Sequence, residues 1–105
     1  MEISFADALL AADCNSKRRS AARWGADGFD LVGRRLGELA AVDGADVEQL
    51  PATVIEQGDD GAVTVIFDRG RLTVNAVPIN GRGPTNDIKS ANGLRIVSLI
   101  LSDLA

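Results

Sequence analysis

Cysteine, lysine and carboxylate side chains are the only groups in this chain whose types suggest catalytic chemistry. The sequence contains no histidine, no tyrosine and a single cysteine. Without histidine, the commonest general base near neutral pH is absent, and Ser-His-Asp and Cys-His catalytic arrangements are excluded. One thiol and no imidazole also exclude the usual zinc, copper and haem ligand sets. The remaining candidates, Cys14, Lys17, Lys89 and paired carboxylates, lie in no recognisable motif, so we expect a non-catalytic protein without a cofactor.

Cys14 is the strongest of these candidates. Lys17 and Arg18 follow it within about one helical turn, and nearby cations lower the pKa of a thiol. A reactive cysteine also needs a partner base, and the sequence offers no histidine for that role. We therefore favour a small, half-buried residue near the end of a helix.

Two turn regions carry other polar groups. Asp59 and Asp60, with Asp68, offer carboxylates to a hard cation, but calcium needs six or more oxygens and no EF-hand spacing is present. Acidic residues beside glycine are routine in hairpin turns. The run Gly81 to Gly83 suggests a phosphate loop, yet Pro84 follows it and no Gly-Lys-Ser/Thr appears. We favour a solvated loop without a role, and an exposed contact loop with Arg82 at its tip is the alternative.

Length and composition are those of one globular domain. The chain has 105 residues, 46% hydrophobic and 25% charged, which predicts a single domain over residues 1–105. The net charge of −4 disfavours a general binder of phosphate backbones. A lone cysteine is typical of a reducing cytoplasm. The excess of arginine over lysine, nine to two, indicates a GC-rich bacterial or phage genome. We expect no signal peptide and no membrane span.

The pattern of apolar residues predicts an α+β fold. Ser4 with Asp7 forms a capping box for a first helix that can continue to Trp24. A second helix is expected over 27–42, with Gly33 and Gly37 forming a flat strip for close packing. Strands are expected over 53–56, 62–67 and 72–77, joined by tight turns that require antiparallel pairing. Thr73, Asn75 and Val77 share a partly solvated face of the last strand.

The C-terminal third is expected to contain a loop over 78–86 and a helix over 88–104. The predicted architecture is α-α-β-β-β-α: a three-stranded antiparallel meander with two N-terminal helices and one C-terminal helix on one face. Gly93 weakens the terminal helix, and a loop followed by a strand over 94–101 is the alternative.

The last twelve residues carry eight apolar side chains. One stripe, including Leu94, Val97, Leu101 and Leu104, can cover the sheet. Ile96, Leu99 and Ile100 remain, and they suggest association, with Leu104 also considered at the interface. The sequence therefore predicts a homodimer or a complex with another protein.

The favoured function is a small non-catalytic cytoplasmic binding protein of inhibitor, immunity, chaperone or adaptor type. Its expected contact residues are Ile96, Leu99, Ile100, Arg82 and Trp24. The alternative is a nucleic-acid-binding regulator that uses a basic cluster beside Trp24. That cluster comprises Lys17, Arg18, Arg19, Arg23, Arg34 and Arg35. A small-ligand site around Asn75, Asn80, Arg82 and Asp87 is the third and weakest hypothesis.

Overall fold

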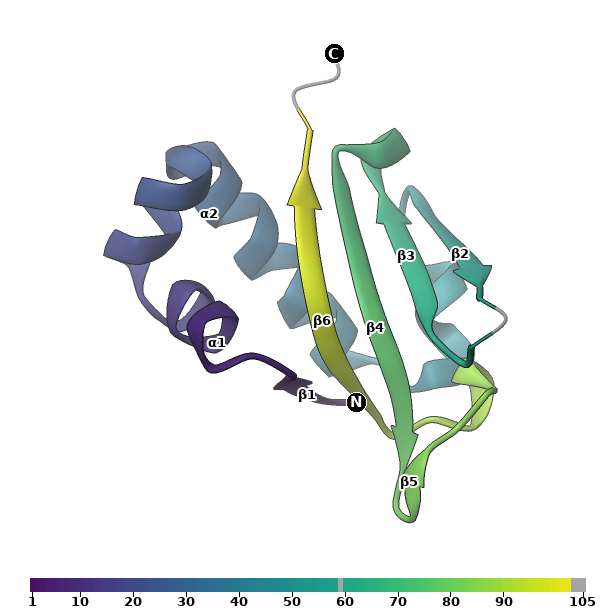
Figure 1. Ribbon diagram of the computed structural model, residues 1–105. Coiled ribbons are helices and arrows are strands. Elements are labelled where there is room, and N and C mark those ends of the chain that lie inside the picture. Colours follow the sequence, from purple (N-terminus) through teal and green to yellow (C-terminus); the bar gives the residue numbers. More distant parts are fainter. Residues whose placement is uncertain (59, 103–105) are drawn as a thin grey trace.

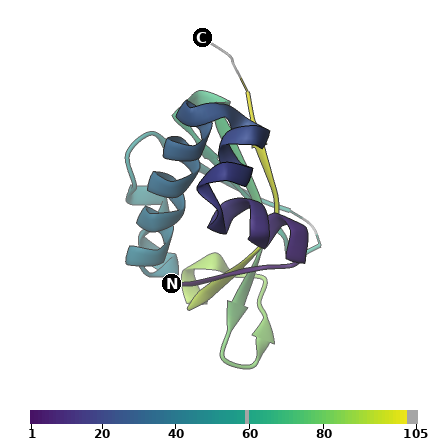
Figure 2. The ribbon, with the colours of Figure 1, turned by 90° about the vertical axis from the view of Figure 1, so that its left-hand side faces the viewer.

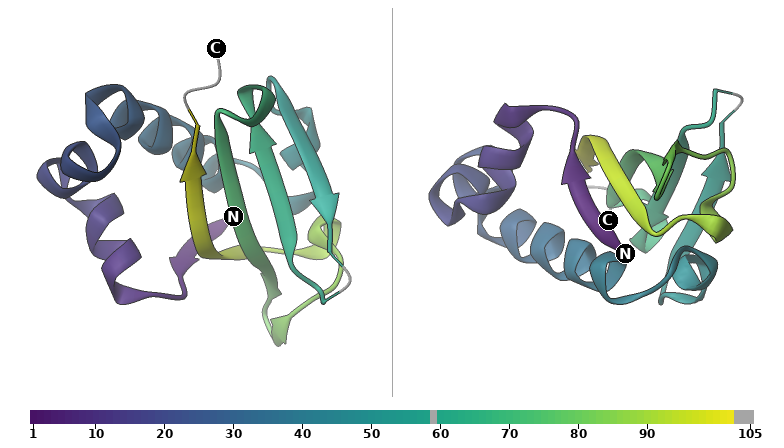
Figure 3. Two further views of the ribbon diagram at one scale, coloured as in Figure 1. Left: turned by 45° about the horizontal axis from the view of Figure 1, so that its top comes forward. Right: turned by 90° about the horizontal axis from the view of Figure 1, so that it is seen from below.

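The computed structural model describes residues 1–58 and 60–102. It has two layers, a twisted mixed sheet and a helical layer that covers one of its faces (Figure 1). Figure 2 and Figure 3 show the long helix lying on one side of the sheet only. In chain order the elements are β1 (Glu2–Phe5), α1 (Ala8–Asn15), α2 (Lys17–Ala41), η1 (Gly44–Gln49), β2 (Thr53–Gln57), β3 (Val63–Phe67), η2 (Asp68–Gly70), β4 (Leu72–Asn80), β5 (Gly83–Pro84), η3 (Ile88–Ser90) and β6 (Gly93–Leu101). The α+β class is therefore confirmed.

The predicted architecture is wrong, because the sheet is larger than a meander. Its strand order is β1-β6-β4-β3-β2, with β5 paired to β4, and it has six strands within the described residues. The expected antiparallel strands β2, β3 and β4 are present at its centre and one edge. Both ends of the chain add strands to them: β6 pairs antiparallel with β4, and β1 pairs parallel with β6.

The expected C-terminal helix over 88–104 is wrong, and the alternative strand is confirmed as β6. A register shift in the β4–β6 pairing explains the misleading spacing. Asn75 pairs with Ser98 and Ala76 pairs with Ile96, so Val97 is an extra, bulged residue. The bulge puts Ile96 and Leu99 on the same face of the sheet, three residues apart, which is also the spacing of a helix face.

The expected capping box at Ser4 is wrong as well. Ser4 lies in β1, where Ile3 and Phe5 turn toward the core and Glu2 and Ser4 turn away. Asp7 caps α1 instead, because its Oδ1 accepts the backbone N–H of Leu9 at 2.7 Å. Four residues are too few to show a strand period, and the pairing comes from β6 at the other end of the chain.

The long helix α2 covers the sheet. Ser16 caps it, accepting the N–H of Arg19 at 3.3 Å, so the first helix, expected to continue to Trp24, is interrupted at Ser16. The break expected between Trp24 and the second helix is confirmed at Gly25. Gly25 has φ 78° and kinks the helix. A Cβ on Gly33 or Gly37 would meet no atom within 4 Å, so the expected close-packing strip is wrong.

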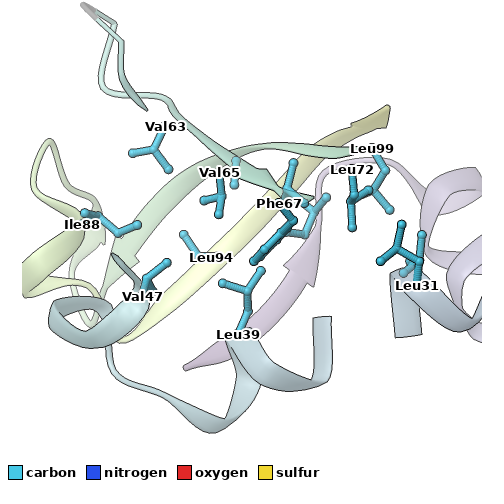
Figure 4. Packing of buried hydrophobic residues seen from close by; sticks show 14 of the residues in the cluster. Leu31, Leu39, Val47, Val63, Val65, Phe67, Leu72, Ile88, Leu94 and Leu99 are labelled. Atoms are coloured by element: carbon cyan, nitrogen blue, oxygen red, sulfur yellow. The ribbon is translucent and has the colours of Figure 1, made fainter. Parts of the chain in front are cut away.

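The core lies between α2 and the inner face of the sheet (Figure 4). Phe67 is at its centre, fully buried, with Leu39 of α2 and Val47 of η1 also fully buried. The rest of the cluster comprises Leu10, Leu31, Val32, Val63, Val65, Leu72, Val74, Ala76, Ile88, Leu94, Ile96 and Leu99. Such burial of aliphatic and aromatic side chains is the main favourable term in folding. No helix within residues 1–58 and 60–102 is long and apolar enough to cross a membrane.

Candidate functional site

The candidate site is the open face of the sheet, the face that α2 leaves uncovered (Figure 1). The strand register aligns one row of side chains across four strands, which we call the apolar row: Val54, Ile66, Thr73 and Ile100. Val54 and Ile100, at its two ends, are 58% and 54% exposed. Ile66 and Thr73 between them are half-buried. Large aliphatic side chains this exposed, in one continuous row, are typical of a contact surface.

A polar ladder crosses the sheet beside the apolar row. The Thr64 hydroxyl donates to Asn75 Oδ1 at 2.9 Å, and Asn75 Nδ2 donates to Ser98 Oγ at 2.8 Å. These three residues lie on β3, β4 and β6 in register. Because these two hydrogen bonds already pair the Thr64 hydroxyl and the Asn75 amide, covering the ladder costs less than covering three separate polar side chains. The partly solvated face expected for Thr73, Asn75 and Val77 is the part of this surface that the sequence indicated.

The open face continues past β6 to the first helix. Val97, the bulged residue, is 48% exposed and Leu9 of α1 is 67% exposed. Both line a shallow pocket of about 320 Å³ that also includes Ser98 of the ladder. Glu56, on the edge strand β2, and Arg95, on β6 where β1 pairs beside it, are exposed charges on opposite sides of the open face. The pocket past β6 is also lined by four charged residues, Asp7, Asp13, Arg19 and Arg23. The surface therefore has an apolar and neutral middle with charged side chains on both sides.

A strained corner adjoins the Val54 end of the apolar row. Ala52, Asp68 and Arg69 all have positive φ, at 51°, 53° and 60°, and each non-glycine residue in this region costs about 1–2 kcal/mol. The backbone N–H of Asp68 donates to Ala52 O at 2.9 Å. A pocket of about 440 Å³ lies here, lined by Leu50, Ala52, Thr53, Val54, Ile66 and Arg69. Strain of this kind persists only where surrounding contacts impose it.

Arg35 supplies those contacts from beneath the sheet. Its side chain is 5% exposed, and it donates to Asp68 Oδ1 at 2.7 Å and to Glu38 Oε2 at 2.9 Å. The guanidinium also lies 4.9 Å from the centre of the Phe67 ring. Burial lowers the pKa of Arg35, but the hydrogen bonds and charges of Asp68 and Glu38 outweigh it and leave the pKa raised. Arg35 is thus a positioning residue for the β3–β4 turn and lies out of reach of nucleic acid.

The rest of the expected basic cluster is also partly neutralised. Asp13 binds Arg19 Nε at 3.0 Å and Arg23 Nη1 at 2.6 Å. The hydrogen bond from Arg23 is the main cause of the lowered pKa of Asp13. Arg23 also lies over the Trp24 ring at 5.1 Å. Lys17, Arg18 and Arg34 are exposed, so the six residues do not form one free basic face.

The structure does not bring the expected protein-contact residues together. Ile96 and Leu99 are core residues at 0% and 5% exposure, and only Ile100 of that trio reaches the open face. Trp24 is half-buried beside Leu101, at the C-terminal end of β6. Arg82 is exposed in the β4–β5 turn, at the opposite end of the sheet. Leu104 lies outside the described residues.

The carboxylates considered as cation ligands are also dispersed. Asp68 pairs with Arg35, and Asp60 Oδ1 accepts the backbone N–H of Ala62 at 3.1 Å. Asp59 lies outside the described residues. In the described part of the chain, no three acidic or cysteine side chains come together as metal ligands would.

Cys14 is predicted to react slowly with thiol reagents. Burial, followed by the charge of Asp13, raises the pKa of its thiol, and Arg23 opposes this only in part. Fewer thiolates are then present at neutral pH, and the thiolate is the nucleophile. Alkylation of the folded protein by iodoacetamide should be slower than alkylation of the urea-unfolded chain, and should accelerate as the pH rises. Equal rates in the two states at pH 7 would contradict this environment.

No protein-family model, curated protein or solved structure matches this chain. Two features of the site had no signal in the sequence: the apolar row depends on strand register, and the Arg35 network joins residues 33 positions apart. The alternation of apolar and polar residues in β4 and the apolar excess that included Ile100 were the signals that pointed to the open face.

Proposed function

We propose that the protein is a non-catalytic, cytoplasmic binding protein that forms a homodimer by packing two open faces together. The observation that carries the proposal is the apolar row, with an exposed aliphatic side chain at each end. The lack of histidine and the raised pKa of Cys14 support a non-catalytic role. A single cysteine supports a reducing compartment.

The apolar row is complementary to itself. A two-fold axis that runs nearly parallel to the strands, between the Ile66 and Thr73 columns, superposes one sheet on the other in reverse strand order. Val54 of one copy then faces Ile100 of the second, and Ile66 faces Thr73. Two sheets stacked this way keep their strands within about 30° of each other. Both ends of the row become buried, as an isologous contact requires.

The charges on the two sides of the open face favour this axis over the perpendicular one. An axis parallel to the strands carries Glu56 to the β6 side of the second copy, where Arg95 lies one row away. An axis across the strands at the apolar row instead leaves Glu56 on the β2 side of the second copy, far from Arg95 on β6. Opposite charges that lie near each other fix the register. The polar ladder lies inside the contact with its hydrogen bonds already made.

The homodimer is tested by placing a charge in the apolar row. Light scattering of the unaltered protein should give twice the chain mass of 11.0 kDa. Ile100→Arg should raise the dimer dissociation constant about thirtyfold or more, because it buries an unpaired cation at an anchor position. The matched control is Gln49→Arg, which adds the same charge on exposed η1 and should leave the mass unchanged. A single-chain mass at every concentration, or equal dissociation constants for Ile100→Arg and the control, would refute the dimer.

A further inference from the structure

The outer edge of β2 presents unpaired backbone groups. The N–H of Gly58 donates to Ala62 O at 2.8 Å, and the N–H of Asp68 donates to Ala52 O at 2.9 Å. Inward and outward groups alternate along an antiparallel strand, so Val54 and Glu56 direct their peptide groups toward β3. Thr53, Ile55 and Gln57 direct theirs outward. β2 is the last strand in the sheet order, so within residues 1–58 and 60–102 no strand pairs with these groups.

This edge lacks the features that normally block strand addition. Natural edges carry lysine, proline or a bulge, or are very short. β2 has five residues, Thr53-Val54-Ile55-Glu56-Gln57, in continuous register with β3. Its only charged side chain is Glu56. The edge is therefore a ready template for a strand from another chain.

The charges around the outer edge of β2 indicate which kind of added strand would bind there. Residues 36–68 carry eight acidic and no basic side chains, whereas the rest of the chain carries seven acidic and eleven basic ones. Two of the eight, Glu38 and Asp68, are paired with Arg35, which leaves six. Within residues 1–58 and 60–102, no salt bridge joins the described members of these six to a cation. Glu56 and Asp60 lie at the Gln57 end of the edge, and η1, which contributes Asp46 and Glu48, packs against β2. Arg69 is the basic residue nearest to Glu56 in the sequence. It lines the pocket beside Thr53, at the other end of the β2 edge.

We propose that the outer edge of β2 binds an extended, basic polypeptide segment as an added strand, with its cations near Glu56 and Asp60. A second copy of β2 is a poor occupant, because its acidic side chains would face those of the first copy. The added strand uses the backbone edge of β2, whereas the homodimer uses the open face of the sheet. Glu56 is the one side chain that both proposals use, so Gln57→Pro is the variant that tests the edge alone. Failure of one leaves the other standing.

The probe is a synthetic eight-residue peptide that alternates valine and lysine, compared with one that alternates valine and glutamate. We expect the lysine peptide to bind, measured by calorimetry, and to shift the amide NMR signals of Thr53, Ile55 and Gln57. The glutamate peptide should bind at least tenfold more weakly, because like charges at the edge repel it. Equal affinities, no binding of the lysine peptide, or amide shifts confined to other strands would each overturn the proposal.

Two variants separate the backbone contribution from the charge contribution. Gln57→Pro removes one outward N–H at an exposed position, where an edge tolerates proline, and should weaken lysine-peptide binding about tenfold. Glu56→Lys should weaken it by a similar factor. The matched control Glu2→Lys makes the same charge change on β1, at the opposite edge, and should change the affinity less than twofold. Unaltered binding by both test variants, with their folds verified by circular dichroism, would refute strand addition.

Discussion

Replacing Asp68 by asparagine is expected to lower the free energy of unfolding by about 3 kcal/mol. The Asp68 carboxylate is one of two anionic partners of the buried Arg35 guanidinium, at 2.7 Å. Asparagine keeps an oxygen that accepts a hydrogen bond but removes the charge, so Glu38 is the one anionic partner left. A buried cation that loses an anionic partner is still removed from water, but the attraction of that partner no longer offsets the cost of desolvation. Asparagine tolerates the left-handed backbone found at this position, so the loss reports on charge and not on strain. Urea denaturation followed by circular dichroism measures it.

A double-mutant cycle isolates the pair. Arg35→Met with Asp68→Asn should be less destabilising than the sum of the two single changes, because removing the cation removes the need for its partner. The long aliphatic chain of methionine keeps most of the contact with Phe67, where Arg35 now lies. Strict additivity, or a loss below about 1 kcal/mol for Asp68→Asn, would mean that the network does not stabilise the turn.

Gly44→Ala is the second large expected effect, a loss of about 2–3 kcal/mol in the free energy of unfolding. A Cβ at Gly44 would overlap the carbonyl oxygen of Ile88 and approach that of Ala91 to 2.9 Å. Both atoms belong to the backbone around η3, which cannot swing away as a side chain can. The clash would separate η1 from η3, two short helices that pack together beneath the sheet. Thermal and urea denaturation measure the change.

Gly37→Ala is the matched control for Gly44→Ala. It adds the same methyl group within helix α2, at an exposed position where no atom lies within 4 Å. Alanine favours a helix over glycine by about 1 kcal/mol, so this variant should be slightly more stable than the natural chain. Destabilisation by both variants to the same extent would contradict the close packing of η1 on η3.

The strands at the centre of the fold could be predicted from the sequence because their signals are local. β3 is a run of β-branched and aromatic residues bounded by turn residues, and β4 alternates apolar and polar side chains. The ends of the chain could not be predicted because their strands depend on each other. β1 is only four residues long and pairs with β6, while the bulge at Val97 gives β6 a helix-like spacing.

The site was only partly predictable for a similar reason. Ile100 was expected at an interface and reaches the open face, although in a strand and not in a helix. Arg35 was assigned to a basic surface because a sequence does not show that Asp68, on a distant turn, will bury and pair it. Val54 could not be predicted as a contact residue, because its position beside Ile66 and Ile100 depends on the strand register.

The most direct test of the proposed dimer is a mixed disulfide across its two-fold axis. Val54→Cys and Ile100→Cys are made separately in a Cys14→Ser background, which removes the natural thiol, and are then oxidised alone and mixed. The proposed packing predicts that the mixed pair cross-links faster than either protein alone, because Val54 of one copy faces Ile100 of the other. Absence of cross-linking, or cross-linking of each protein with itself as fast as the mixture, would contradict the account.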